Sequence, residues 1–210
     1  MIKIKICGIT NAEDAMLAAN LGADLVGFNF VKESPRKVSV KLASEVISSL
    51  PGFVASVGVF ADEDLDALVK AAKKCALKYI QLHGSESPEY CATVFSKTSL
   101  PIIKAFRVKD DSVVEEMKNY LNCADFFLLD AFSEDAAGGT GKVFNWDIAL
   151  KARDLNKPFF LAGGLAPENV ADAVEKVRPF GVDAASGVER LQRRKDYDKM
   201  KNFITAARRA

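Results

Sequence analysis

Residues 1–22, MIKIKICGITNAEDAMLAANLG, contain a complete strand, turn and helix. Isoleucine alternates with lysine over residues 2–6, which is the period of two of a β-strand. The second half places alanine and leucine on one helical face and ends at Gly22, a residue type that commonly stops helices. The thiol of Cys7 therefore lies at the end of a strand, on the same face as Lys5.

The same unit recurs along the whole chain, which predicts eight strands, each followed by a helix. The strand patterns are IKIKICG (2–8), DLVGFNF (24–30), FVASVGVF (53–60), YIQLHG (79–84), PIIKAFRV (101–108), DFFLLDAF (125–132), PFFLAGGL (158–165) and GVDAASGV (181–188). The helical patterns are 11–22, 40–50, 62–75, 87–98, 111–122, 145–156, 166–177 and 197–209.

Regular alternation of strand and helix indicates parallel strands joined by right-handed crossovers. Several strand patterns are almost continuously apolar, as expected when both faces of a sheet are covered. An open doubly wound sheet is one arrangement of such units. Eight units that close on themselves match the (β/α)8 barrel, or TIM barrel, a parallel eight-stranded barrel within an α/β fold. Because no linker rich in Pro, Ser or Gly divides the sequence, we expect residues 1–210 to form a single domain.

The overall composition excludes several classes of partner. Hydrophobic residues make up 49% of the 210 residues, charged residues 27%, and the formal net charge is +1. A chain so close to neutrality has no global field that favours nucleic acid or an anionic membrane. One basic stretch, RLQRRKDYDKMKNF (190–203), is interrupted by acidic residues, and we interpret it as the solvated face of a helix and its approach.

The cysteines and the single histidine indicate neither a metal site nor a disulfide framework. The four cysteines lack the CxxC spacing of zinc sites, and His83 has no second histidine beside it. The first residues follow a strand pattern and not a signal-peptide pattern, and no apolar run approaches the roughly 20 residues that cross a bilayer. We therefore expect a cytoplasmic protein with no metal, no membrane partner and reduced thiols. The cysteines are Cys7, Cys75, Cys91 and Cys123.

In a barrel of this kind, the chemistry belongs to the carboxyl ends of the strands and to the loops that follow them. Arg36, in one of these loops, has the planar fork that suits a substrate carboxylate, although an exposed loop arginine is the common alternative. We assign no catalytic role to His83, and Arg107 faces either the pocket or a neighbouring helix. The predicted strand ends offer Cys7, Asn29, His83, Arg107, Asp130 and Ser186.

Glycines gather in the loops after the last three predicted strands. Exposed backbone N–H groups in such loops bind phosphate without Lys or Arg, and the absence of a side chain lets the oxygens approach. Any one of these glycines alone would be interpreted as a turn, but three consecutive strand ends favour a phosphate site. The predicted phosphate-binding residues are Gly163, Gly164, Ser186 and Gly187, with Gly139 and Gly141 closing over from the preceding loop.

Cys7 and Asp130 form a candidate pair of catalytic groups on opposite sides of one pocket. Asp130 ends the apolar run FFLLD, where poor solvation raises the pKa of a carboxyl group toward the range of a general acid. A helix cap or a surface turn is the alternative for this aspartate. Barrel closure would bring the two positions around a common pocket as base and acid, with Lys5 favouring the thiolate if it points inward.

The chain resembles the phosphoribosylanthranilate isomerase family of tryptophan biosynthesis over essentially its whole length. The resemblance rests on KICGIT (5–10), GADLVGFNFVKESPRKV (22–38), VGVF (57–60), QLHG (81–84), LLDAF (128–132), GGTGKVFNW (138–146), LAGGLAPENV (161–170), VDAASGVE (182–189) and KDYDKM (195–200). Each motif alone is weak, whereas the set in this order is specific.

The resemblance implies an Amadori rearrangement of N-(5-phosphoribosyl)anthranilate to 1-(o-carboxyphenylamino)-1-deoxyribulose 5-phosphate, without cofactor or metal. The general base of the family falls on Cys7, the general acid on Asp130 and the carboxylate-binding arginine on Arg36. Its phosphate loops fall on the glycine clusters described above. The expected partner is a small phosphorylated molecule, and the protein is expected to be a monomer or a homodimer.

Two other functions stay open from the sequence. One is another phosphosugar isomerase or epimerase, although the metal-dependent epimerases would require histidine and aspartate ligands that a single histidine does not supply. The other is a catalytically silent, phosphate-binding barrel that acts as a subunit for a partner. Turnover of the substrate distinguishes the second of these from an enzyme.

Overall fold

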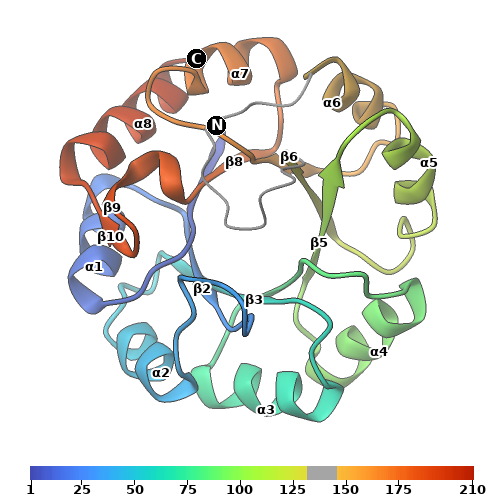
Figure 1. Ribbon diagram of the computed structural model, residues 1–210, viewed down its shortest axis with the longest axis horizontal. Coiled ribbons are helices and arrows are strands. Elements are labelled where there is room, and N and C mark those ends of the chain that lie inside the picture. The colour runs from blue at the N-terminus through green and yellow to red at the C-terminus, as the bar shows by residue number, and fades with distance from the viewer. Residues whose placement is uncertain (132–145) are drawn as a thin grey trace.

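The computed structural model describes residues 1–131 and 146–210, which form a ring of helices around a closed barrel of parallel strands (Figure 1). The strands are β1 (Lys3–Ile6), β2 (Leu25–Asn29), β3 (Ala55–Phe60), β4 (Tyr79–Leu82), β5 (Ile102–Val108), β6 (Phe126–Ala131), β7 (Phe159–Leu161) and β8 (Gly181–Ala184). The helices are α1 (Ala12–Leu21), α2 (Val40–Ser48), α3 (Leu65–Cys75), α4 (Pro88–Thr98), α5 (Ser112–Lys118), α6 (Trp146–Arg153), α7 (Val170–Val177) and α8 (Tyr197–Arg209).

Strand β1 pairs with both β2 and β8, and this double pairing closes the barrel. Lys5 is the register partner of Leu25 on one side and of Asp183 on the other. The predicted eight-stranded barrel is therefore confirmed, and the open doubly wound sheet is wrong.

Side chains alternate between the interior of the barrel and the layer of helices. The interior is a separate apolar cluster formed by Leu25, Val57, Ile103, Ala105, Leu128, Phe160 and Ala162. The residues between them on each strand point outward and pack against the helices, as the strand period of two requires. Asp130, two residues after the inward Leu128, is thus directed to the mouth of the barrel.

The helix boundaries follow local chemistry that the sequence signals. The side chain of Asn11 accepts a hydrogen bond from Asp14 N at 2.9 Å and begins α1. Gly22 ends that helix with a φ of 98°, a left-handed conformation that glycine adopts without strain. Asp64 caps α3 in the same way as Asn11 caps α1, by accepting from Ala67 N at 3.0 Å.

The basic stretch at residues 190–203 differs from its predicted form. Part of it belongs to a small antiparallel hairpin, formed by β9 (Glu189–Leu191) and β10 (Arg194–Lys195), before α8 begins. The interpretation as a wholly solvated face is wrong for Lys195, which is only 3% exposed. Its ammonium group is buried because it contacts the Glu189 carboxylate, a pairing that charge alone does not reveal in a sequence.

Within the described ranges, no helix has the length and apolar character that crossing a membrane requires.

Asp24 joins three elements where the barrel closes. Its carboxylate accepts from Ile4 N at 2.8 Å and from Lys3 Nζ at 3.0 Å, and it pairs with Arg208 of α8 at 2.7 Å. Burial raises the pKa of Asp24, but these three groups outweigh it and lower the pKa below the ordinary value of 3.8. A carboxyl group with a lowered folded-state pKa contributes stability above that ordinary value and loses the contribution as the pH falls through the lower one.

We expect Asp24→Asn to lower the free energy of unfolding by about 1–2 kcal/mol at pH 7, because it removes charge-assisted contacts. The difference from wild type should shrink as the pH falls through the lowered pKa of Asp24, because both side chains are neutral below it. Denaturant unfolding at pH 7 and pH 3 checks this. Asp125→Asn is a matched control, since Asp125 accepts from Ile102 N at 2.8 Å in the corresponding position between β5 and β6. An equal loss at both pH values would contradict the role of the Asp24 charge.

Candidate active site

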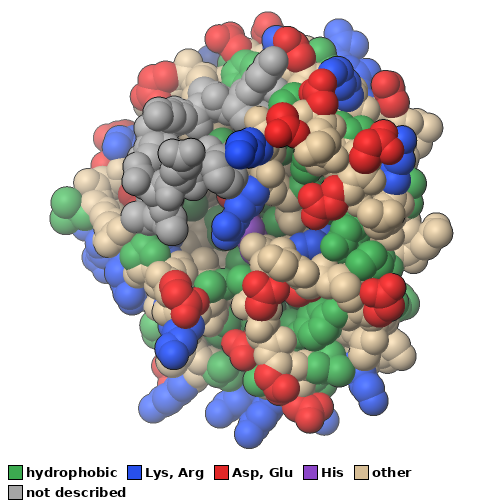
Figure 2. Space-filling model, turned by 45° about the vertical axis from the view of Figure 1, so that its right-hand side comes forward, with side chains coloured by type: hydrophobic (Ala, Val, Ile, Leu, Met, Phe, Trp, Pro, Cys, Tyr) green, Lys and Arg blue, Asp and Glu red, His purple; other side chains and the backbone are tan. Residues whose placement is uncertain are grey.

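A cavity of about 190 Å³ lies at the carboxyl ends of the strands, where the sequence predicts the chemistry. The same end of the barrel adjoins a wider cavity, and Figure 2 shows the purple of the single histidine within a hollow bordered by Lys and Arg side chains. The predicted site residues that line the smaller cavity are Cys7, Arg36, Asp130, Gly163, Gly164, Ser186 and Gly187. The predicted Gly139 and Gly141 lie outside the described residues.

Cys7 follows β1 directly and is 8% exposed. A Cβ atom at Gly27, on the adjacent strand β2, would lie 2.7 Å from the Cys7 sulfur. Glycine at position 27 therefore leaves the space that the thiol occupies. The sequence contains a signal for this residue, because glycine inside a strand often marks a close approach.

Cys7 lies above a buried ion pair in the barrel. Lys5 Nζ is 2.8 Å from Asp183 Oδ2, and the Lys5 side chain is fully buried. Burial raises the pKa of the Cys7 thiol above its ordinary value, and Asp183 adds to this, whereas the charges of Lys5 and Lys195 oppose it. Lys5 does point inward, as the thiolate hypothesis requires, but its charge is largely balanced by Asp183.

Burial has the opposite effect on the ammonium group of Lys5. Burial lowers the pKa of Lys5, but Asp183 and Cys7 outweigh burial and raise it above the ordinary value. Lys5 is thus held as a cation beneath the sulfur.

Asp130 contacts a histidine that the sequence analysis left without a role. Asp130 Oδ2 is 3.3 Å from His83 Nε2, and the Gln81 amide nitrogen is 2.8 Å from Nδ1 of the same ring. If the Gln81 amide donates to Nδ1, the ring proton is on Nε2 and faces the carboxylate. The Asp130 side chain is 31% exposed, so it is better solvated than its apolar strand suggests.

Two acceptor atoms beside the same cavity have no hydrogen-bond partner among the described residues. They are Gln81 Oε1 and Asp183 Oδ1, and both atoms are buried.

Arg36 lines the cavity but is already paired on one side. Its Nε and Nη2 atoms each donate to the Glu189 carboxylate at 2.7 Å. The hydrogen bonds that Arg36 donates to Glu189 raise the pKa of Arg36 above its ordinary value, although burial opposes them. The alternative of an exposed loop arginine is thus excluded, because the Arg36 side chain is only 11% exposed.

The predicted phosphate loops depend on glycine for two different reasons. Gly163 has a φ of +78°, and a Cβ there would lie 2.1 Å from Ala131 N, so both conformation and space require glycine. A Cβ at Gly187 would lie 2.0 Å from the carbonyl oxygen of Leu165. The loops after β7 and β8 therefore pack backbone against backbone, as a site built from amide groups requires.

A wider cavity of about 1110 Å³ continues from this site across the loops after β2 to β5. Asn29, Arg36 and His83 line both cavities. Arg107, for which the sequence left two orientations open, lines the wider cavity.

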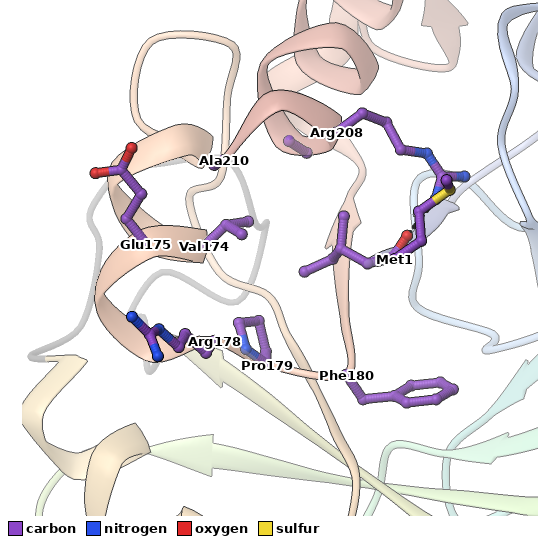
Figure 3. A pocket seen from close by; sticks show the side chains of 10 residues that line it. Met1, Val174, Glu175, Arg178, Pro179, Phe180, Arg208 and Ala210 are labelled. Atoms are coloured by element: carbon purple, nitrogen blue, oxygen red, sulfur yellow. Dashed lines mark hydrogen bonds between the residues drawn. The ribbon is translucent and has the colours of Figure 1, made fainter.

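A third cavity, of about 890 Å³, lies at the other end of the barrel between Met1, α7 and α8 (Figure 3). None of the predicted site residues lines it. The size of a cavity alone therefore does not locate the site in this protein. Among residues 1–131 and 146–210, no cluster of three or more His, Cys, Asp or Glu is placed to hold a metal ion.

Four residues around the cavity were missed by the sequence analysis. Gly27 and Gln81 lie on strands at inward positions, which strand periodicity alone could have identified. The sequence indicates the roles of Asp183 and Glu189 less clearly, because Lys5 and Arg36, with which they pair, lie far away in the sequence.

The chain matches known proteins over its full length. Residues 4–206 match the model of the N-(5'-phosphoribosyl)anthranilate (PRA) isomerase family. The N-(5'-phosphoribosyl)anthranilate isomerase of Pelobacter propionicus is 48% identical over 99% of this chain and 96% of its own length. That of Geotalea daltonii is 49% identical over 99% of this chain and 97% of its own length.

Solved structures agree with these relatives. Phosphoribosyl anthranilate isomerase from Thermotoga maritima is 40% identical, with a TM-score of 0.93 over all of both chains. A phosphoribosyl anthranilate isomerase in complex with reduced 1-(o-carboxyphenylamino)-1-deoxyribulose 5-phosphate is 38% identical, with a TM-score of 0.90 over all of both chains.

The buried pair beneath Cys7 predicts opposite effects from two substitutions. Lys5→Met removes a cation and should raise the pKa of Cys7 further, whereas Asp183→Asn removes an anion and should lower it. The pH dependence of Cys7 alkylation, followed on the Cys7 peptide by mass spectrometry, measures both. If the pKa of Cys7 shifts in the same direction in both variants, or in neither, the ion pair does not set the pKa of Cys7.

Proposed function

The chain belongs to the N-(5'-phosphoribosyl)anthranilate isomerase family, and we propose that Cys7 and Asp130 are the general base and general acid of its reaction. The protein is an isomerase of tryptophan biosynthesis. It converts N-(5-phosphoribosyl)anthranilate to 1-(o-carboxyphenylamino)-1-deoxyribulose 5-phosphate. The observation that carries the proposed roles is that one cavity is lined by a thiol, a carboxyl group, an arginine and the glycine loops.

The first step opens the sugar ring. Asp130, in its protonated form, gives a proton to the ring oxygen, and the bond between this oxygen and C1 breaks. The anilino nitrogen supplies its electron pair, so C1 becomes an iminium carbon. The Nε2 atom of His83, 3.3 Å from Asp130 Oδ2, supports an orientation of the carboxyl group toward the cavity.

The second step moves a proton from carbon. The iminium group makes the C2 proton acidic, and the Cys7 thiolate removes it to form an enolamine. The enolamine becomes the aminoketose when C1 gains a proton and the C2 hydroxyl loses one. These last transfers return the acid and the base to their starting protonation states.

The two ends of the substrate need separate binding groups so that the reacting carbons lie between acid and base. We propose that Arg36 binds the anthranilate carboxylate, and that the backbone of Gly163, Gly164, Ser186 and Gly187 binds the phosphate. Glu189 occupies the Nε/Nη2 edge of the guanidinium group and leaves its Nη1/Nη2 edge for a second carboxylate. Gly139 and Gly141 remain predicted contributors to the phosphate site.

We expect the purified wild-type protein to convert phosphoribosylanthranilate, and Cys7→Ser and Asp130→Asn to lower kcat by about 10²–10⁴-fold each. Loss of substrate fluorescence follows the reaction, and circular dichroism confirms the fold of each variant. Cys75→Ser is a matched control, since Cys75 is buried in the helical layer, away from the cavity. A wild-type protein that binds the substrate without turning it over would instead be a silent barrel.

The proposed role of Arg36 predicts a change in substrate preference. Arg36→Lys keeps a cation but loses the planar fork, and we expect kcat/KM to fall by about 10–100-fold, as for a charged hydrogen bond. The phosphoribosyl derivative of aniline, which lacks the carboxylate, should be affected far less. Equal losses for both substrates would contradict carboxylate binding by Arg36.

We further propose that residues 1–210 act as one domain in the cytoplasm, as a monomer or a homodimer. All four cysteines are free thiols, which suits a reducing compartment. The phosphoribosylanthranilate isomerase of Thermotoga maritima is a dimer from which monomers have been generated. Light scattering on the purified protein distinguishes the two oligomeric states.

A further inference from the structure

Two charged residues in the motifs that carry the family resemblance have no role in the reaction described above. Glu189 ends VDAASGVE and Lys195 begins KDYDKM, and the two residues are register partners in the β9–β10 hairpin. Neither residue lines the smaller cavity that contains Cys7 and Asp130. Both are buried and charged, which indicates specific partners.

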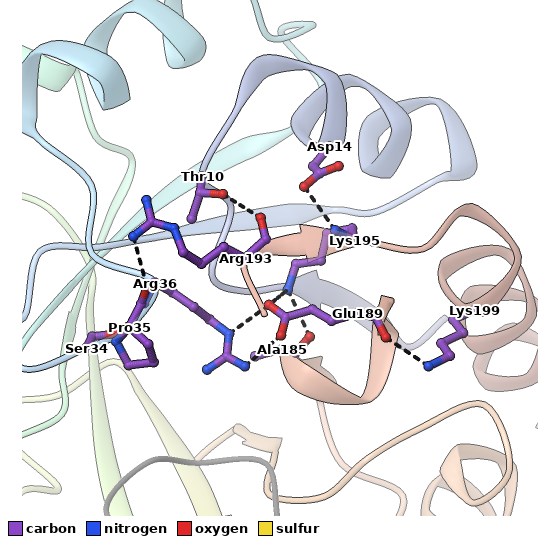
Figure 4. Close-up of polar contacts among 10 residues, drawn as sticks. All are labelled: Thr10, Asp14, Ser34, Pro35, Arg36, Ala185, Glu189, Arg193, Lys195 and Lys199. Carbon is purple, nitrogen blue, oxygen red and sulfur yellow. Dashed lines mark hydrogen bonds and ion pairs between the residues drawn. The ribbon is translucent and has the colours of Figure 1, made fainter. Parts of the chain in front are cut away.

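The Glu189 carboxylate lies between two cations. It accepts from Arg36 Nε and Nη2 at 2.7 Å each and from Lys195 Nζ at 3.2 Å (Figure 4). Burial raises the pKa of Glu189, but the two cations outweigh burial and lower it. The cluster of Arg36, Glu189 and Lys195 therefore holds two positive charges and one negative charge. Its net positive charge attracts an anionic substrate.

Lys195 connects this cluster to the phosphate loop. Its ammonium group donates to the carbonyl oxygen of Ala185 at 2.8 Å, and Ala185 precedes the predicted phosphate-binding Ser186. Burial lowers the pKa of Lys195, and the Glu189 carboxylate opposes this. A single buried residue thus contacts both the partner of Arg36 and the backbone of the phosphate loop.

The hairpin is itself fixed to the loops that carry Cys7 and Arg36. Arg193, at its turn, has a φ of 73°, a conformation that costs a non-glycine residue free energy and persists when contacts hold it. Its carbonyl oxygen accepts from Thr10 at 2.7 Å, and its guanidinium group donates to Pro35 O at 3.0 Å. The backbone of Lys195 also donates to Asp14 at 3.0 Å.

We propose that Glu189 is a positioning residue, which fixes the Arg36 guanidinium so that its free edge faces the substrate carboxylate, and that Lys195 couples this arginine to the phosphate loop. A bidentate contact fixes the plane of a guanidinium group as well as its place. Without Glu189 the arginine would rotate about its side-chain bonds, and its free edge would no longer be held toward the cavity. This inference rests on the proposed role of Arg36 in carboxylate binding.

The test for Glu189 compares the natural substrate with the aniline analogue that lacks the carboxylate. For Glu189→Gln, we expect kcat/KM to fall by about 10–100-fold for the natural substrate, mainly through KM, with little change for the analogue. Glu13→Gln is the matched control, because exposed Glu13 pairs at 3.2 Å with Arg194 of the same hairpin. Equal losses for both substrates, or no loss for either, would overturn the positioning role.

Two further variants keep the result interpretable. If Glu189→Gln does not fold, Glu189→Asp keeps the charge but shortens the side chain, and the same change in substrate preference is expected. Arg36→Lys separates this inference from the proposed function. If Arg36→Lys leaves the substrate preference unchanged, carboxylate binding by Arg36 fails. If Arg36→Lys changes the preference and the Glu189 variants do not, only the positioning role fails.

The test for Lys195 uses inorganic phosphate as a competitive inhibitor of the wild-type enzyme. Lys195→Met should raise the inhibition constant of phosphate by about 10–100-fold and also lower the preference for the carboxylate substrate. Lys195→Arg keeps the charge and should restore part of both properties. Lys201→Met, at an exposed lysine of α8, is the matched control. An unchanged inhibition constant in folded Lys195→Met would overturn the coupling.

Discussion

The ion pair between Lys5 and Asp183 is the interaction on which the active-site end of the barrel depends. It joins the first strand to the last, at a register where β1 and β8 close the cylinder. Removing one partner of such a buried pair typically costs about 3–5 kcal/mol, because the other charge is left uncompensated. The same pair lies beneath Cys7, where the charge of Lys5 lowers the pKa of the thiol and the charge of Asp183 raises it. Closure of the fold and the chemistry of the proposed base therefore share one pair of side chains.

Space at the site is determined mainly by glycine. Gly27 leaves room for the Cys7 sulfur, Gly163 for the backbone of Ala131, and Gly187 for the carbonyl of Leu165. Each contact is shorter than a Cβ atom tolerates. Besides their proposed role in phosphate binding, the glycines therefore bring the loop after β7 close to β6 and its Asp130, and the loop after β8 close to the loop after β7. The proposed phosphate site and the proposed acid are therefore packed together.

The charged side chains at the site form one balanced ion pair and one cluster with an excess positive charge. Lys5 and Asp183 cancel, whereas Arg36 and Lys195 share the single carboxylate of Glu189. A substrate that carries a carboxylate and a phosphate brings negative charge to the side with the surplus cation. Such fixed, preorganised charge orients a substrate without rearrangement of the protein during the reaction.

The sequence by itself determined the architecture and most of the cavity lining. Strand periodicity and the repeated helix signals predict the barrel, and the carboxyl ends of its strands place Cys7, Asp130 and the loop glycines at one end. Only the tertiary structure decided which charges meet. Lys5 and Asp183 are 178 positions apart, and Arg36 and Glu189 are 153 apart, so no local pattern links them. Barrel closure and strand register create these contacts, and this is why the sequence predicts a solvated Lys195 that is buried in the structure.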